Sequence, residues 1–470
     1  MGAPKATESV SKKTDAVEVT AAGKAVDQKL DNHHTYEFGG PVGVTCMMAF
    51  FPCLMYYLWI CTTFYDGQVT YPKSVGEIQP FFNRMFDHVV EDASPTPWAW
   101  KVYTSYFFFQ LFIAWIIPGY YQEGLPVPSL GYKTLMYNCN AYQCFYLSIV
   151  VAGVLHFTDI FHLGSIIEHF GELMTVAIIY GFSVSIIMYA WTIARNEQVR
   201  MSGNAVYDFW MGACLNPRIG PVDLKLWAEV RIPWMILFFI SLGGASKQFD
   251  DYGYVSANMG FKVLATFLFA NACAKSEECI PQTWDIFYEK WGFMIIFWNF
   301  AGVPFTYCYS DVYMATHDPA GYRFSTLGYV ALYGTLLTAY YIFDTAMAQK
   351  SNFKMQMQGV FKRRKTFPQL PGNVVENPRF IQTAHGNKLL VDGWWRVVRK
   401  PNYTSDWFQV LSWALVVWTA SPIPYFYPLF FTTMLLHRTG RDFERCAIKY
   451  GKDWEEYCRI VPYKFIPYVY

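Results

Sequence analysis

Residues 173–193 read LMTVAIIYGFSVSIIMYAWTI, a run that contains no charged residue. A helix needs about 20 mostly apolar residues to cross the hydrocarbon core of a bilayer, and this run provides them. Comparable runs occur along most of the chain. The sequence therefore predicts an all-α integral membrane protein rather than a set of soluble domains.

The composition agrees with this fold class. The chain has 470 residues, of which 53% are hydrophobic, 20% aromatic and only 16% charged. A soluble domain carries about 25% charged residues, so the charge here is too sparse to coat a soluble surface of this size. The net charge of +1 gives no global field that would attract nucleic acid.

We expect about ten transmembrane helices, with nine as the alternative. The last candidate segment contains Pro422 and Pro424 and is long enough for two short helices or one helical hairpin. The candidate segments are 41–64, 103–121, 142–161, 173–193, 232–245, 261–273, 292–309, 326–346 and 407–436.

Lysine and arginine are unevenly distributed among the connecting segments. They gather in residues 195–231, 350–400 and 438–452, whereas residues 65–92 carry more acidic than basic side chains. This pattern follows the positive-inside rule and places both termini on the cytosolic side. Residues 1–38 are polar, lack an apolar signal segment and are expected to form a disordered cytosolic tail. Residues 39–348 would hold spans one to eight, and 349–470 would face the cytosol and include the last two spans.

The sequence lacks the catalytic motifs that are typical of several classes of soluble enzyme. The chain has no glycine-rich dinucleotide or phosphate loop, no nucleophile elbow and no zinc-binding spacing among its 11 cysteines and 9 histidines. We therefore expect no metal site. Polar residues inside or beside apolar spans are costly and mark functional sites by default, so they become the candidates.

One group of candidates surrounds the seventh span. Glu277, Glu278 and Asp285 precede it, and Glu278 and Asp285 would share a helix face because they are seven residues apart. Tyr307 lies within the span itself. Each residue has either a structural role, as a loop charge or an interface aromatic, or a role as a proton donor.

A second group lies near the C-terminus. Lys350 and Lys354 are four residues apart and would share one helix face, either as a headgroup anchor or as a grip for phosphate. Residues 437–457 read HRTGRDFERCAIKYGKDWEEY, which combines basic residues with aromatic rings. Such rings offer flat faces to a nucleotide base, and the basic residues offer contacts to its phosphates.

Longer motifs identify a family. The stretch 203–218, GNAVYDFWMGACLNPR, together with Gly393-Trp394-Trp395, Asn402-Tyr403 and residues 437–457, resembles the sterol reductase family over residues 36–470. Members of that family reduce the C14, C7 or C24(28) double bond of sterols, and the membrane domain of lamin B receptor belongs with them. The sequence most resembles the C24(28) enzymes of ergosterol synthesis, through YEFGG at 36–40, NACAK at 271–275, TWD at 283–285, YEK at 288–290 and FIPYV at 465–469.

The resemblance implies an NADPH-dependent reductase of the endoplasmic reticulum membrane. Its reaction would convert ergosta-5,7,22,24(28)-tetraen-3β-ol to ergosterol, and the sterol would reach a pocket within residues 39–348 from the lipid bilayer. Other sterol-biosynthesis enzymes would be possible partners. The alternatives are a C14 or C7 sterol reductase and a non-catalytic sterol-binding membrane protein.

The resemblance also implies the site residues. An isolated alkene is not electrophilic, so an acid must protonate it before a hydride can add. The donor would come from Glu277, Glu278, Asp285 and Tyr307. The NADPH-binding segment, 349–470 with Lys350 at its start, would contribute Lys350, Lys354, Leu390, Trp395, Asn402, Tyr403, Asp442, Cys446, Lys449, Tyr450 and Tyr457.

Overall fold

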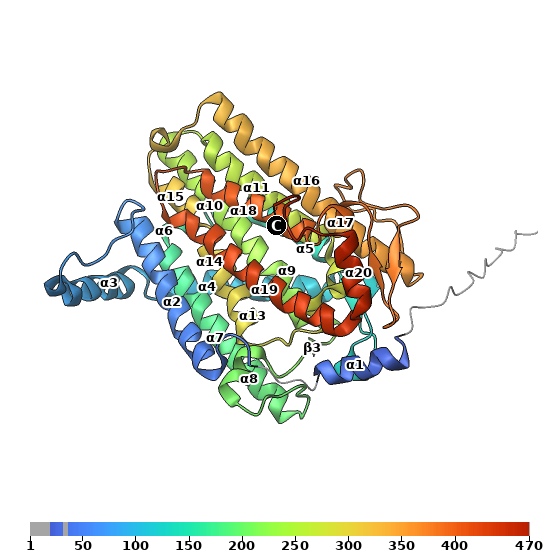
Figure 1. Ribbon diagram of the computed structural model, residues 1–470. Helices are drawn as coiled ribbons and strands as arrows, with labels where there is room; N and C mark the ends of the chain where they lie inside the picture. Colours follow the sequence, from blue (N-terminus) through green and yellow to red (C-terminus); the bar gives the residue numbers. More distant parts are fainter. Residues whose placement is uncertain (1–18, 32–35, 470) are drawn as a thin grey trace, which may run out of the picture.

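The computed structural model describes residues 19–31 and 36–469, and helices make up most of it (Figure 1). The longer helices are α2 (Gly40–Phe64), α4 (Pro97–Ile116), α5 (Ala141–Phe157), α7 (Phe170–Ala194), α10 (Pro233–Tyr252), α11 (Ala257–Lys275), α16 (Thr326–Met357), α18 (Pro401–Leu415) and α19 (Phe426–Tyr450). The shorter ones are α1 (Ala21–Asp31), α3 (Ile78–Asp92), α6 (Ser165–Glu168), α8 (Ala205–Met211), α9 (Leu224–Arg231), α12 (Trp284–Phe287), α13 (Phe293–Phe297), α14 (Val303–Thr306), α15 (Tyr309–Thr316), α17 (Trp394–Val397) and α20 (Lys452–Ile460).

Three antiparallel hairpins complete the fold. They pair β1 (Tyr120–Glu123) with β2 (Met136–Cys139), β3 (Arg218–Ile219) with β4 (Val222–Asp223), and β5 (Phe380–Gln382) with β6 (Lys388–Leu390). The third hairpin lies in the polar segment that precedes α18.

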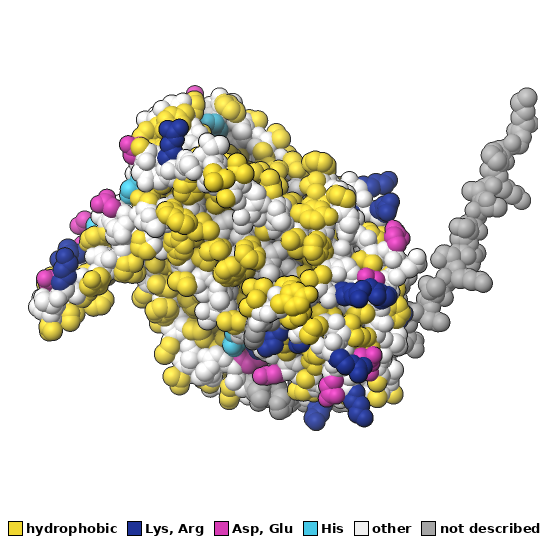
Figure 2. Space-filling view, turned by 45° about the horizontal axis from the view of Figure 1, so that its top comes forward, with side chains coloured by type: hydrophobic (Ala, Val, Ile, Leu, Met, Phe, Trp, Pro, Cys, Tyr) yellow, Lys and Arg dark blue, Asp and Glu magenta, His cyan; other side chains and the backbone are white. Residues whose placement is uncertain are grey.

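The predicted all-α membrane class agrees with the helices. Among the described residues, five helical segments are long and apolar enough to cross a membrane: α2, α7, α9 with α10, α11 and α16. A shorter apolar helix, α5, adds to them. Figure 2 shows hydrophobic side chains across the middle of one face, with most charged side chains at its edges. The count of about ten crossings stays a prediction.

The seventh predicted span is not one regular helix. It divides into α13, a π-helical turn at Trp298–Gly302, and α14. Pro304 has no N–H and cannot bond the carbonyl of Phe300 four residues earlier. The Tyr103 hydroxyl of α4 donates to that carbonyl instead, at 2.8 Å. A neighbouring helix thus satisfies the backbone acceptor that the proline leaves free.

The last predicted span is a helical hairpin, as one of the two sequence-based alternatives proposed. Helix α18 ends at Leu415, the chain turns through Pro422 and Pro424, and α19 returns. Helix α18 also lies beside α16 (Figure 1). The two prolines lie in the turn between the helices, where the missing N–H and the restriction on the preceding residue disfavour a continuous helix.

Two features of the structure bear on the expected division of the chain into segments. Helix α16 continues to Met357 and passes through the expected division between residues 348 and 349. Within the predicted disordered tail, residues 21–31 form α1. Alanine and other good helix formers dominate α1, and its buried Asp27 bonds His385 far along the chain. The remaining parts of the tail, 1–18 and 32–35, lie outside the described residues.

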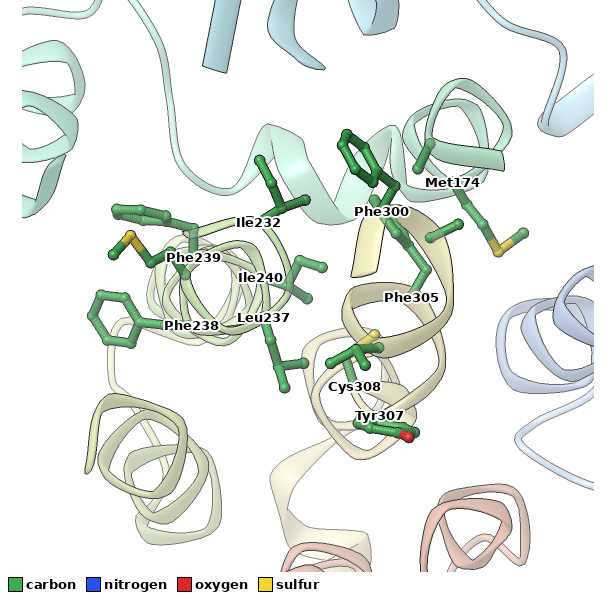
Figure 3. Packing of buried hydrophobic residues seen from close by; sticks show 14 of the residues in the cluster. Met174, Ile232, Leu237, Phe238, Phe239, Ile240, Phe300, Phe305, Tyr307 and Cys308 are labelled. Atoms are coloured by element: carbon green, nitrogen blue, oxygen red, sulfur yellow. The ribbon is translucent and has the colours of Figure 1, made fainter. Parts of the chain in front are cut away.

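A single apolar core extends through the helices. Figure 3 shows Leu237 and Ile240 on the side of α10 that faces Phe305 and Cys308, with Ile232 immediately before the helix. Tyr307 lies at the edge of this cluster, and its hydroxyl points away from α10 (Figure 3). The same core includes Val410 and Trp413 of α18, so the C-terminal hairpin packs on the earlier spans.

One ion pair is completely enclosed by this core. Lys262 of α11 lies 3.3 Å from Asp311 of α15, and neither side chain is exposed. The Lys262 ammonium also lies 4.2 Å from the ring centroid of Trp413 on α18. These contacts join three helices around one buried charge.

Replacing Asp311 by alanine should lower the free energy of unfolding by about 3–5 kcal/mol, because Lys262 would remain buried without its counter-charge. Thermal unfolding of the detergent-solubilised protein measures this loss. The double variant Lys262→Met/Asp311→Leu should recover most of it. An unchanged transition in Asp311→Ala would show that the pair does not stabilise the fold.

Candidate functional site

The cytosolic end of α16, as the charge pattern predicts it, carries the two lysines picked out in the sequence. The Lys350 ammonium lies 4.0 Å from the ring centroid of Trp395 on α17. One turn later, Lys354 donates to the carbonyl of Gln282 at 2.8 Å. Their spacing of four places both on the side of α16 that faces the C-terminal segment.

A third lysine joins them from the start of α18. Lys400, which sequence reasoning did not select, forms an ion pair with Asp442 of α19. Burial would raise the pKa of Asp442, but the ammonium of Lys400 holds it below its ordinary value. Asp442 is therefore a carboxylate, and it fixes the position of Lys400 above the Tyr403 ring, 5.2 Å from its centroid.

Apolar side chains form the wall beside these charges. Leu390 of β6 and Trp395 pack with Phe353 of α16 in one small cluster. The Trp395 indole donates to the carbonyl of Ala346 at 2.9 Å, which fixes the ring that Lys350 overlies. Tyr457 of α20 packs in an adjacent cluster with Val391 and Val461.

The last turns of α19 carry three more predicted residues. The Tyr450 hydroxyl accepts from Asn387 at 3.3 Å. Lys449 lies 3.5 Å from Asp27 of α1. Burial, together with Asp442, raises the pKa of Cys446 to about 12, so its side chain is a thiol at neutral pH and not a nucleophile.

The assembled cluster suits an anionic, flat ligand such as a dinucleotide. The cluster has more lysines than carboxylates: four lysines (Lys350, Lys354, Lys400 and Lys449) against the two carboxylates, Asp442 and Asp27, that pair with them. Asn402 is a second feature that suits a bound ligand, because its buried Oδ1 has no hydrogen-bond partner within residues 19–31 and 36–469. Phosphates would neutralise the excess charge, and a donor on a ribose or amide would satisfy Asn402.

The acidic candidates are held apart from this cluster or within ion pairs. Glu277 lies 2.7 Å from Arg231 of α9, with both side chains only 2% exposed. The other oxygen of Glu277 accepts from the backbone N–H of Ala141 at 2.6 Å. Both carboxylate oxygens thus have a partner within the fold, so Glu277 has a structural role here.

Glu278 and Asp285 also have arginine partners. Glu278 lies 2.8 Å from Arg364, and burial raises its pKa despite that pair. Asp285 lies 2.6 Å from Arg438 of α19. Burial would raise the pKa of Asp285, but Arg438 holds it below its ordinary value, so Asp285 keeps its charge.

Tyr307 is the candidate with a proton to give. Its ring stacks on Tyr427 of α19 at a centroid distance of 3.6 Å, and its hydroxyl accepts from the Trp298 indole at 2.9 Å. An accepted hydrogen bond leaves the phenolic proton directed elsewhere. The four acid candidates are therefore not one constellation, and Tyr307 stands apart from the other three.

Asp406 is a residue that sequence reasoning passed over. It lies on α18, is half-buried, and interacts electrostatically with both Tyr307 and Tyr427. The signal was present in the sequence, because Asp406 comes directly before the apolar run that begins at Trp407. This electrostatic interaction with the tyrosine pair adds Asp406 to the candidate residues.

Helix α1 was also missed. Asp27 is only 2% exposed and meets the Tyr132 hydroxyl at 3.1 Å, His385 at 3.1 Å and Lys449. His385 follows β5 in the hairpin that carries Leu390. Helix α1 therefore connects that hairpin to α19 beside the lysine cluster. No local pattern could reveal it, because its partners are far along the chain.

Replacing Asp27 by asparagine should loosen α1, since a buried hydrogen bond to a charged group is worth about 1.5–3 kcal/mol. Limited digestion with trypsin measures this loosening as faster cleavage after Lys24 and Lys29. Gln28→Ala, at an exposed position of the same helix, is the matched control and should leave the rate unchanged. Equal rates for Asp27→Asn and the unaltered chain would show that Asp27 does not hold α1.

Several known sterol reductases are similar to this chain over most of its length. Delta(24(24(1)))-sterol reductase erg4A of Aspergillus fumigatus is 45% identical over 451 residues, which cover 94% of this chain and 96% of that protein. The Delta(24(24(1)))-sterol reductase of Gibberella zeae is 44% identical, over 94% of this chain and 74% of that protein. The Delta(14)-sterol reductase of Dictyostelium discoideum is 33% identical, over 93% and 92%. Residues 32–470 match the ergosterol biosynthesis ERG4/ERG24 family, and the chain belongs to it.

Proposed function

We propose that this protein is a sterol reductase that reduces the C24(28) double bond of an ergosterol precursor. The proposal rests on sequence identity to two fungal Delta(24(24(1)))-sterol reductases, which is 45% and 44% over 94% of this chain. A C14 reductase is the second candidate, because relatives of that name also align along most of the chain. Their identity is lower, and we therefore favour C24(28).

The lysine cluster is the proposed cofactor site. NADPH, when bound, supplies a hydride. Lys350, Lys354 and Lys449 would bind its phosphates, and Lys354 would make a point-charge contact where an arginine would make a bidentate one. Asp442 orients Lys400, and Asn402 with Tyr403 lies where α18 begins. Trp395, Leu390 and Tyr457 provide the apolar wall.

The proton is assigned to Tyr307. Protonation of a methylidene carbon leaves a cation on the more substituted carbon, C24, and water must be excluded from that cation. The tyrosine pair of Tyr307 and Tyr427 offers aromatic faces near such a charge. Asp406 is the group that we assign to returning a proton to Tyr307. The arginine pairs of Glu277 and Asp285 argue against those two as donors.

The proposed setting is the endoplasmic reticulum membrane. The chain would cross the bilayer about ten times, with both termini and the lysine cluster facing the cytosol, where NADPH is available. The basic residues of 195–231, 350–400 and 438–452 support that orientation through the positive-inside rule. The sterol would enter from the lipid.

Sterol profiling tests the proposed reaction. The chain is expressed in cells that lack the C24(28), the C14 or the C7 sterol reductase, one at a time. Restored ergosterol in the C24(28)-deficient cells alone is the expected result. Rescue of the C14 or C7 defect without rescue of the C24(28) defect would overturn the assignment.

Replacing Lys350 by methionine should raise the KM for NADPH about tenfold, because a charge-assisted contact to phosphate contributes about 1.5–3 kcal/mol. Steady-state kinetics with varied NADPH measures this change. Lys365→Met removes an exposed charge from the same segment and should leave KM as it was. Equal values for both variants would remove Lys350 from the cofactor site.

Replacing Tyr307 by phenylalanine should lower kcat about 10²- to 10⁴-fold, which is the usual contribution of a general acid. The ring stack on Tyr427 would remain, so the KM for NADPH should change little. Tyr309→Phe is the control, since that buried hydroxyl donates to the Met55 carbonyl and has no assigned role in the reaction. Near-normal turnover in Tyr307→Phe would direct the search to Glu278 and Asp406.

A further inference from the structure

Helix α3, which follows α2 and precedes α4 in the sequence, projects from the body of the molecule (Figure 1). It contacts the ends of α2 and α7. His88 of α3 stacks on Phe64, the last residue of α2, at a centroid distance of 4.2 Å. The proposed reaction assigns no role to this helix.

An apolar stripe runs along α3. Ile78, Phe82, Phe86 and Val90 follow one another at intervals of four residues and so share one face. All four are exposed, with Phe82 and Phe86 at 63% and 66%. Phe81 on the adjoining face is buried. The exposed stripe thus lies next to the side of α3 that packs on the rest of the protein.

Another side of α3 is polar. Asn83, Asp87 and Glu91 repeat at the same interval of four and form a polar row about 100° round the helix from the stripe, with Arg84 beyond them. Figure 2 shows this division on the projecting part, with charged side chains along its upper edge and hydrophobic ones along its lower edge. A strongly divided helix that exposes large apolar side chains matches the helices that lie in the plane of a membrane interface.

The position of α3 fits that interface. Phe108, Phe112 and Trp115 of α4, a predicted transmembrane helix, are exposed as well. The opposite end of α2 adjoins the basic C-terminal segment, where Glu37 pairs with Arg441 at 2.6 Å. Helix α3 and the lysine cluster therefore lie at opposite ends of α2.

We propose that α3 lies flat in the membrane–water interface, at the end of the molecule away from the lysine cluster, with Phe82 and Phe86 inserted among the lipids. The partner is the bilayer itself. Asp87, Glu91 and Asp92 outnumber Arg84 on this helix, so attraction to acidic headgroups does not drive the contact. Insertion depends on apolar area and occurs in neutral phosphatidylcholine.

An environment-sensitive fluorophore tests this placement in the full chain. Phe86→Cys lies in the apolar stripe and Asp87→Cys in the polar row, about 100° further round the helix, and each is labelled and reconstituted into phosphatidylcholine vesicles. The label at 86 should emit at shorter wavelength and be quenched by nitroxide-bearing lipid, whereas the label at 87 should do neither. The unaltered chain, labelled in parallel, supplies the background from exposed Cys46 and Cys53.

Two results would overturn the proposal. Equal, water-like emission from both labels would show that α3 projects into solvent. A shifted emission at 86 that lipid nitroxide does not quench, and that disappears when the protein is diluted among vesicles, would identify a second copy of the chain as the partner. The pair Phe82→Cys and Asn83→Cys repeats the comparison one turn earlier, in case one labelled chain fails to fold.

Discussion

Charges that packing removes from water must find opposite charges within the protein, and the arrangement of helices here depends on that pairing. Arg231 with Glu277, Lys262 with Asp311, and Lys275 with Asp344 each join segments from different parts of the chain. Removing one member leaves a buried charge uncompensated, which costs far more than the pair contributes. The pairs therefore specify which helices meet, and the apolar contacts fill the space between them.

The need for a buried charge to have a partner also distinguishes the roles of the acidic residues. Glu277 is engaged on both oxygens, by an arginine and by a backbone N–H. Tyr307 has a different environment, with an aromatic ring on one side and an indole donor at its oxygen. Tyr307, the proposed proton donor, thus has different partners from the ion-paired acids, although the sequence shows them all near the seventh span.

Local sequence pattern predicted the features that depend on local composition. The apolar runs gave α2, α7 and α16, and the pair Pro422 and Pro424 gave the hairpin of α18 and α19. The pattern could not show that Arg231 would meet Glu277, 46 positions later, or that Asp27 would meet His385, 358 positions later. Such contacts arise from tertiary packing. Lys400 was missed for the same reason, since it acquires its role from Asp442 on another helix.

Helix α16 has a consequence for how the protein sits in a membrane. Its 32 residues extend for roughly 48 Å at 1.5 Å per residue, well beyond the roughly 30 Å of a hydrocarbon core. Lys350 and Lys354 are part of that same uninterrupted rod. Their height above the bilayer is therefore set by how the apolar portion of α16 matches the membrane thickness, and bilayer thickness becomes a variable that controls how far the basic cluster stands from the headgroups.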